Sequence, residues 1–168
     1  MAVLIIKNAT YENENAPDAL INYIMNKSKM SEPQVYGGQG VSVSNPANSM
    51  YTVKRIFSHT SGKQAEHFII SFTPYEIAAK HSYAIKMFAY ELCTFFYYNQ
   101  IQFAFHDKHI DSSSYLNNPH IHFVMNTTNI QTGTKTRIDF QNINAFTRYI
   151  KSLLQKHDIT DELAVIFK

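Results

Sequence analysis

The sequence contains very little cysteine: Cys93 is the only one among 168 residues. A single thiol excludes an internal disulfide and a zinc site built from cysteine ligands, and it predicts a reduced compartment. Charged residues are also scarce, at 17% of the chain, against about 25% in an average globular protein. Lysine and arginine total 15 and aspartate and glutamate 13. The resulting formal charge of +2 neither requires nor excludes a nucleic-acid partner.

Long apolar segments are missing as well. No run approaches the roughly 20 apolar residues that a membrane-spanning helix needs. The apolar stretch at residues 2–6 is too short for the core of a signal peptide, and no small-residue cleavage site follows it. Apolar residues still make up 45% of the chain, which excludes a disordered, collagen-like or coiled-coil protein. We therefore expect one soluble intracellular domain over residues 1–168, with a substantial core.

Hydrophobic patterning predicts a mixture of strands and helices. We expect strands at residues 2–6, 49–58, 66–73, 101–107, 120–128, 135–138 and 163–167. Helices are expected at residues 19–29, 75–98 and 142–156, with a long loop, functional or mobile, at residues 31–48. Most consecutive strands are joined too tightly for parallel crossovers. The sequence therefore predicts an α+β fold, a central antiparallel β-sheet with helices packed on one side.

Histidines gather on one face of a predicted strand. Side chains alternate across a strand, so His120, His122 and Asn126 share one face and apolar residues share the other. His106 ends the preceding strand on its polar side, and pairing of the two strands would bring it to the other two imidazoles. Three imidazoles suit a divalent transition metal and leave coordination positions open for catalysis. The alternative is a strand whose histidines simply face solvent.

Two further polar groups each admit two interpretations. His67 and Ser71 share one face of their strand, where His67 is either a fourth polar-face group or a half-buried strand histidine. Tyr23 lies on the first predicted helix, near Lys27 and Lys29. It is either a core tyrosine whose hydroxyl reaches water or a nucleophile with cations at hand for a phosphate. These residues alone leave both alternatives open.

Three segments, in order, resemble motifs of one family, the P-class mobilisation relaxases of the histidine-hydrophobe-histidine endonuclease superfamily. Residues 23–29 are similar to the family's Tyr-Ile-x-Asn-x-x-Lys segment. Residues 67–76 resemble its His-x-x-x-Ser-Phe-x-Pro-Gly-Glu motif. His106 and Asp107, followed by residues 120–126, resemble its metal motif, His-x-Asp followed by His-x-His-x-x-x-Asn.

The resemblance runs from about residue 17 to residue 140, and Gly133 before Lys135 matches the hairpin that usually follows the metal motif. It implies a central antiparallel sheet with helices packed against it. It also implies an enzyme of the bacterial cytoplasm that nicks one DNA strand at a transfer origin, for conjugative mobilisation of a plasmid or integrative element. Such an enzyme stays joined to the 5′ end of the cut strand through a tyrosine.

Individual roles can be carried over to matching positions. Tyr23 corresponds to the nucleophile, and Asp107 to a residue that orients an imidazole or takes the tyrosine proton. The ligands of one Mn²⁺ or Mg²⁺ ion correspond to His106, His120 and His122. Candidate accessory residues are His67, Ser71, His109 and Asn126.

The implied partner is single-stranded or hairpin origin DNA, bound by a monomer, with accessory mobilisation proteins and a coupling protein as further partners. Phosphate contacts would fall to Lys27, Lys54, Arg55, Lys63, Lys135 and Arg137. Tyr36 and Tyr51 are candidates for stacking on bases. The alternative for the basic residues is a solvated charged face.

The chain also departs from the family pattern. Residues 110–119 separate His106 from His120 by more than the family usually has, so His109 competes with His106 as third ligand. Tyr75 stands where the second motif has glycine. Rolling-circle initiators and transposases of the same superfamily usually carry their tyrosine on a helix after the metal motif, where Tyr149 lies. A third alternative is a module that binds origin DNA without cutting it.

Overall fold

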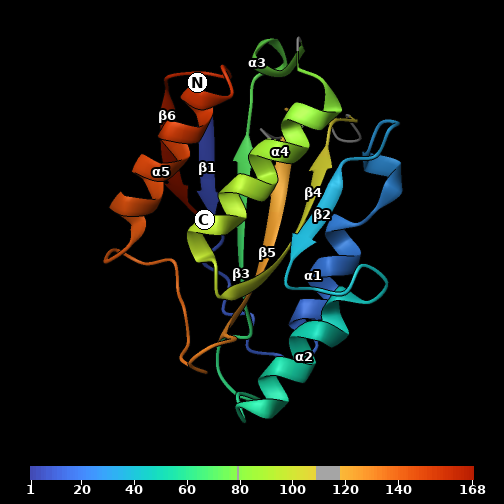
Figure 1. The fold of residues 1–168 in the computed structure, drawn as a ribbon, viewed down its shortest axis with the longest axis vertical. Coiled ribbons are helices and arrows are strands. Elements are labelled where there is room, and N and C mark those ends of the chain that lie inside the picture. Colours follow the sequence, from blue (N-terminus) through green and yellow to red (C-terminus); the bar gives the residue numbers. More distant parts are fainter. Residues whose placement is uncertain (79, 109–117) are drawn as a thin grey trace.

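The computed structural model describes residues 1–78, 80–108 and 118–168. Six strands form one sheet in the order β2-β4-β5-β3-β1-β6 (Figure 1). The strands are β1 (Ala2–Ile6), β2 (Tyr36–Gln39), β3 (Ala65–Ser71), β4 (Asn99–His106), β5 (His120–Asn129) and β6 (Leu163–Phe167). The helices are α1 (Ala16–Ile24), α2 (Pro46–Ile56), α3 (Pro74–Ala78), α4 (Ser82–Cys93) and α5 (Ile143–Lys156), with 3₁₀ turns η1 (Lys27–Lys29) and η2 (Thr94–Phe96). The predicted α+β class is confirmed.

The sheet is antiparallel, as predicted, except at one edge, where a parallel pair makes it mixed. The pairs β1–β3, β2–β4, β3–β5 and β4–β5 are antiparallel, but β6 runs parallel to β1. Parallel neighbours need a long connection between them rather than a tight turn. The chain reaches β6 only after helix α5, which gives it the length to return in the parallel direction. In the part of the chain that the structure describes, no helix is long and apolar enough to cross a membrane.

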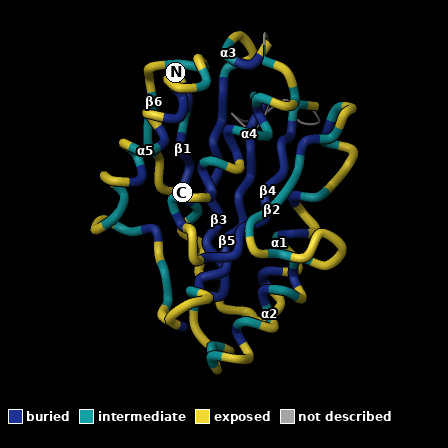
Figure 2. Tube along the Cα trace, in the orientation of Figure 1, coloured by how far each residue is buried: buried dark blue, intermediate teal, exposed yellow. Residues whose placement is uncertain are grey.

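Helices cover both faces of the sheet, so the prediction of helices on one side was wrong. On one face, phenylalanines of the strands pack against α4 and α5. On the other face, Ile21 and Ile24 of α1 and Met50 of α2 pack on Ala104 and Val124. The inner strands β3 and β4 are buried along their whole length, as Figure 2 shows. Polar side chains on either face of these strands therefore need hydrogen-bond partners within the protein.

Residues 49–58, predicted as a strand, lie mostly in helix α2. Pro46 occupies the first turn, and the Asn48 N–H donates a hydrogen bond to the Asn45 side chain at 3.0 Å, which caps the helix. A helical period relates the buried side chains, Ala47, Met50 and Lys54. The β-branched residues of this segment favour a strand locally, but the cap and the packing on the sheet outweigh that preference.

Other segments differ from the prediction in extent. The helix expected at residues 75–98 is divided into α3, α4 and η2, and His81 enters α4 with an extended ψ of 148°. The loop expected at residues 31–48 contains edge strand β2 and the start of α2. The glycines of β2 hide its strand character, yet a Cβ at Gly37 would lie 2.7 Å from the Phe103 ring, so the close approach requires glycine.

The remaining elements lie near their predicted positions. The helix expected at residues 19–29 is α1 followed by η1. The strand expected at residues 135–138 is reduced to an isolated bridge between Thr128 and Lys135. The other predicted strands correspond to β1, β3, β4, β5 and β6, and the last predicted helix corresponds to α5.

We predict that Gly133→Ala destabilises the fold by about 3 kcal/mol or more, because it combines backbone strain with a steric clash. Gly133 has a φ of 72°, and a Cβ there would overlap the Phe57 ring. Gly62→Ala is the matched control, since its φ is 66° but its Cβ would meet only the flexible Lys135 ammonium at 3.1 Å. It should cost only the strain, about 1–2 kcal/mol. Urea denaturation measures both, and equal losses would contradict the role of the Phe57 contact.

Candidate metal centre and nuclease site

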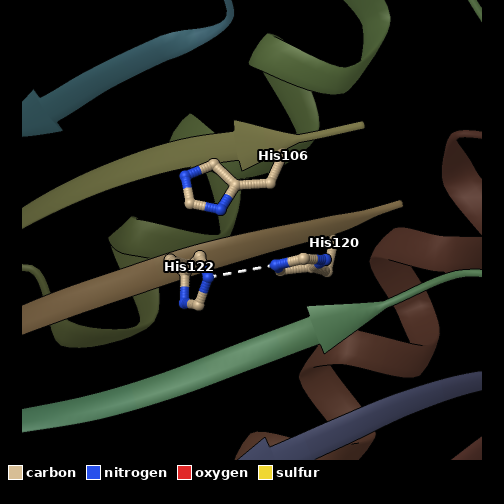
Figure 3. A group of neighbouring side chains, drawn as sticks. All are labelled: His106, His120 and His122. Atoms are coloured by element: carbon tan, nitrogen blue, oxygen red, sulfur yellow. Dashed lines mark hydrogen bonds between the residues drawn. The ribbon is translucent and has the colours of Figure 1, made fainter. Parts of the chain in front are cut away.

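Three histidines converge where β4 ends and β5 begins. His106 lies opposite His120 in the strand register, and Ala104 lies opposite His122. Because side chains alternate along a strand, the three imidazoles project from the same face, as Figure 3 shows. Each ring offers one nitrogen, and these atoms lie within 4.8 Å of one another. The tertiary structure thus brings together the three histidines that the sequence singled out, whereas His109 lies outside the described residues.

Backbone carbonyls orient two of the three rings. His106 Nε2 donates to the Ile24 carbonyl at 2.7 Å, and His120 Nδ1 donates to the Asn118 carbonyl at 2.7 Å. Carbonyls only accept, so the lone pairs of the neutral rings lie on His106 Nδ1 and His120 Nε2. His106 Nδ1 is buried and has no hydrogen-bond partner among the described residues. An unpartnered buried lone pair beside two further imidazoles fits a divalent cation.

Burial keeps these imidazoles neutral. Removal from water lowers the pKa of His106, lowers that of His120 to about 4, and lowers that of His122 well below its usual range. The neighbouring imidazoles further lower the pKa values of His120 and His122. Neutral imidazoles keep a free lone pair at neutral pH, which is the form that binds a metal.

Helix α1 presents Tyr23 to the histidines. The Tyr23 ring meets the His122 ring edge-on, with ring centres 5.4 Å apart, and its residue is 43% exposed. The Lys29 ammonium lies over the Tyr23 ring, 4.4 Å from its centre. Ile24, the next residue in the chain, ends α1 and supplies the carbonyl that orients His106. One helix end therefore positions both the tyrosine and a candidate ligand.

Asp107 bonds the backbone of the segment around η1. Its Oδ1 accepts a hydrogen bond from the Ser31 N–H at 2.7 Å, and its own N–H donates to the Lys29 carbonyl. Asp107 thus ties the segment that follows η1 to the end of β4. Within the described parts of the chain, no hydrogen bond joins Asp107 to an imidazole of the three histidines.

The accessory candidates divide between the cluster and the framework. Ser71 is buried and lies opposite His120 in the register of β3 and β5. His67 is buried behind His122, with its Nε2 2.9 Å from His122 Nδ1. Asn126 lies farther along β5, where its amide bonds Gln100 Oε1 at 2.9 Å and holds the strands under α2. His67 and Ser71 therefore adjoin the cluster, and Asn126 does not.

The basic candidates occupy unlike environments. Lys54 is only 3% exposed, donates to Thr127 Oγ1 at 3.4 Å, and has its pKa lowered to about 8 by burial and by nearby Lys135. Lys63 pairs with the buried Glu66 carboxylate at 2.7 Å. Lys135 is partly buried and donates to the Ser61 carbonyl. Exposed side chains are those of Lys27, Arg55 and Arg137.

A cavity of about 190 Å³ opens beside α2. Tyr51, Lys54 and Arg55 line it together, with Glu14 and Gln64 among the other lining residues. The cavity thus combines an aromatic ring with two cations, the pairing that single-stranded nucleic-acid sites use.

Tyr149, the alternative nucleophile, lies on the opposite side of the sheet from the histidines. It belongs to α5 and packs against Phe95 in the phenylalanine-rich core, with ring centres 5.5 Å apart. Its hydroxyl donates to the Glu91 carbonyl at 2.9 Å. The thickness of the sheet therefore separates Tyr149 from the three histidines.

Sequence reasoning missed the groups that orient the ligands. The Ile24 and Asn118 carbonyls carry no side-chain signal, so only the folded chain reveals them. Tyr11 was missed too, although its hydroxyl lies 3.3 Å from His67 Nδ1. It lies in an irregular segment, where no periodic pattern indicates its direction.

The lowered pKa values predict that the metal-free protein is sensitive to acid. His67, with a pKa of about 3, and His120, with a pKa of about 4, stay neutral when folded, but take up protons below about pH 6.5 when unfolded. Stability therefore falls as the pH drops from about 6.5 toward 4, by about 1.4 kcal/mol per pH unit for each such imidazole. Urea denaturation in chelator at pH 7.5, 6.5 and 5.5 measures it. Unchanged stability between pH 6.5 and 5.5 would contradict the prediction.

Comparison with known proteins places this site in a family. The family model described as "Relaxase: MobA/VirD2-like, nuclease domain" matches residues 23–159. No curated protein sequence matches the chain. A solved structure described as "Molecular Basis of Vancomycin Resistance Transfer in Staphylococcus aureus" is similar, with a TM-score of 0.48 and 11% identity over 82% of this chain and 77% of that chain. Since the family model spans Tyr23, the three histidines and most of the sequence, the chain belongs to the MobA/VirD2-like relaxase nuclease family.

Proposed function

We propose that this relaxase cuts one strand of origin DNA with Tyr23 as the nucleophile and remains covalently joined to the 5′ end. Membership of the family makes the chain a DNA endonuclease that nicks DNA for mobilisation. The observation that carries the finer proposal is the contact of the half-exposed Tyr23 ring with His122, 5.4 Å between ring centres. The same proposal includes accessory mobilisation proteins and a coupling protein as partners of this relaxase.

The relaxase family is metal-dependent, and the donor set here fits one divalent ion, Mn²⁺ or Mg²⁺. The ligands would be His106 through Nδ1, and His120 and His122 through Nε2, because the other nitrogen of each ring has a hydrogen-bond partner outside the three histidines. When bound, the ion supplies positive charge that polarises the scissile phosphate.

The residues around Tyr23 support transesterification. The phenol oxygen attacks phosphorus, the bond to the 3′ oxygen breaks, the phenol proton leaves and the 3′ oxygen takes up a proton. The phosphotyrosine bond conserves the energy of the phosphodiester, so the reverse reaction rejoins the strand. Lys29 adds a positive charge beside the ring, where the phosphate would lie. Asp107 acts indirectly, by tying the segment after Lys29 to β4 through the Ser31 N–H.

The rest of the DNA strand is proposed to follow the face that carries α1 and α2. Arg55 and Lys27 are exposed on the elements that cover this face. The cavity beside α2 suits one nucleotide, with its base stacked on Tyr51 and its phosphate near Lys54 and Arg55. The buried Lys54 lines this cavity and has no carboxylate within ion-pair distance among the described residues, so a phosphate would be its counter-ion.

Covalent capture tests the nucleophile. Purified protein is incubated with Mn²⁺ and a panel of single-stranded origin-type oligonucleotides, followed by a denaturing gel and peptide mass mapping. The adduct should map to Tyr23 and fall at least a hundredfold in Tyr23→Phe and His122→Ala, because one variant lacks the attacking oxygen and the other a ligand. Tyr149→Phe is the matched control and should form the adduct at the wild-type level. An adduct on another tyrosine would overturn the assignment of Tyr23, and DNA binding without any adduct would favour the non-cleaving module.

Salt dependence tests the proposed DNA path. Arg55→Gln removes one phosphate contact, so the slope of log Kobs against log salt should become shallower by about 0.7 for single-stranded DNA. Lys151→Gln removes a charge of the same sign from an exposed position on α5, across the sheet, and should leave the slope unchanged. Fluorescence anisotropy at several salt concentrations measures both. Equal slopes for the two variants would place the DNA elsewhere.

A further inference from the structure

A chain of hydrogen bonds enters the histidine cluster from the side of β3. The Tyr11 hydroxyl lies 3.3 Å from His67 Nδ1, and His67 Nε2 lies 2.9 Å from His122 Nδ1. His122 Nε2 in turn lies 3.0 Å from His120 Nε2, and His120 Nδ1 donates to the Asn118 carbonyl at 2.7 Å. The chain thus consists of four side chains, and His67 connects the half-buried Tyr11 to the proposed ligands His122 and His120.

One end of this chain has a fixed direction. The Asn118 carbonyl can only accept, so His120 Nε2 carries the lone pair of its neutral ring. In the metal-free protein, His122 must therefore donate from Nε2 to make the 3.0 Å contact, which leaves its Nδ1 as an acceptor for His67 Nε2–H. His67 Nδ1 then accepts from the Tyr11 hydroxyl. With the protons donated in the order Tyr11 to His67 to His122 to His120, every donor in the chain faces an acceptor.

A metal ligand needs the opposite arrangement at His122. Its Nε2 must carry the lone pair, so its proton lies on Nδ1 and is donated to His67 Nε2. His67 Nδ1–H then donates to the Tyr11 oxygen. Neutral imidazole and hydroxyl groups can each donate and accept, so this branch of the chain can run in either direction. The Ile24 and Asn118 carbonyls that hold His106 and His120 allow only one direction.

We propose that His67 and Tyr11 are positioning residues that stabilise whichever tautomer His122 adopts, and thereby set the affinity of the site for its divalent ion. The proposal rests on the metal centre proposed above. Protons balance: His122 Nε2 releases one to water, His67 passes its Nε2 proton to His122 Nδ1, Tyr11 passes its hydroxyl proton to His67 Nδ1, and Tyr11 regains one from water. No group in the chain changes its net charge.

Packing supports a built connection at His67. It is 3% exposed and His122 is fully buried, and the two rings stack with centres 5.1 Å apart at 30°. Burial lowers the pKa of His67 to about 3, so it is neutral like the ligands. Groups that hold the second nitrogen of a metal-binding histidine fix its tautomer and orientation, and losing them typically weakens metal binding about 10- to 100-fold.

Tyr11 is held in place by its backbone. It has a φ of 44°, in the left-handed region that non-glycine residues seldom occupy, and its carbonyl accepts from the Gln64 N–H at 2.9 Å. Tyr11 also precedes residues 23–159, over which the family model matches. The outer end of the hydrogen-bonded chain is therefore contributed by a segment that lies outside the family match.

Metal binding without DNA tests the proposal. Mn²⁺ is titrated into chelator-treated protein and followed by electron paramagnetic resonance and calorimetry. His67→Leu should weaken Mn²⁺ binding about 10- to 100-fold. His67→Gln should restore most of the affinity, because its amide both accepts and donates. Tyr11→Phe should cause a smaller loss, whereas Tyr149→Phe, the control, removes a hydroxyl that donates to the Glu91 carbonyl on the other side of the sheet and should bind as wild type.

Nitrogen NMR of the histidine rings reports which ring nitrogen of His122 carries the proton. A purely structural role of His67 would not change this tautomer when metal binds. In the wild type, the His122 proton should lie on Nε2 without metal and on Nδ1 with Zn²⁺, a diamagnetic probe. Should His67→Leu fail to fold, the Mn²⁺ affinity of Tyr11→Phe and the His122 tautomer in that variant decide the question, and wild-type values for both would overturn the proposal. Unchanged Mn²⁺ affinity in His67→Leu, or a His122 proton on the same nitrogen with and without Zn²⁺, would overturn the proposal. Wild-type Mn²⁺ affinity in His122→Ala would instead overturn the metal centre itself.

Discussion

The hydrogen bond from His106 to the Ile24 carbonyl, 2.7 Å long, joins the two halves of the site. Ile24 ends helix α1, where carbonyls lack partners within the helix. By accepting from His106 Nε2, this carbonyl turns Nδ1 toward the other imidazoles and anchors the helix that presents Tyr23. One contact thereby positions both the proposed nucleophile and a proposed metal ligand. Displacing α1 would disturb both at once.

The sheet can hold such a site because its two faces are built differently. One face is packed with phenylalanines, including Phe68 and Phe123, whose rings stack 4.8 Å apart at an interplanar angle of 6°. The other face buries polar side chains under α1 and α2, and several of them form hydrogen bonds with one another or with the backbone. Asn126 with Gln100 holds one part, and the histidines hold another. A rigid apolar layer beneath a bonded polar layer limits the movement of the ligands.

Sequence patterns predicted the parts of this protein that depend on local periodicity. Alternation along residues 120–126 placed His120 and His122 on one face, and the structure has them there. Patterns failed where local preference and packing disagree. The pattern of residues 49–58 predicts a strand, but this segment has a helix cap and packs on the sheet as helix α2. Strand β2 was not predicted because glycines, which strands rarely contain, form its centre. The patterns also did not predict that helices cover both faces of the sheet, because alternation shows that one face of a strand is polar but not whether a helix packs on it.

Motifs and strand periodicity are properties of neighbouring positions, so the amino-acid sequence was enough to predict the family, the α+β class and the residue types of the candidate site. The folded chain was needed to show which nitrogen of each imidazole is free, that Asp107 bonds a backbone N–H, and that Tyr149 lies across the sheet. The folded chain also revealed the contact between the Tyr11 hydroxyl and His67 Nδ1. The physical reason is that these features depend on carbonyl positions and burial, which arise only when segments distant in the chain pack together.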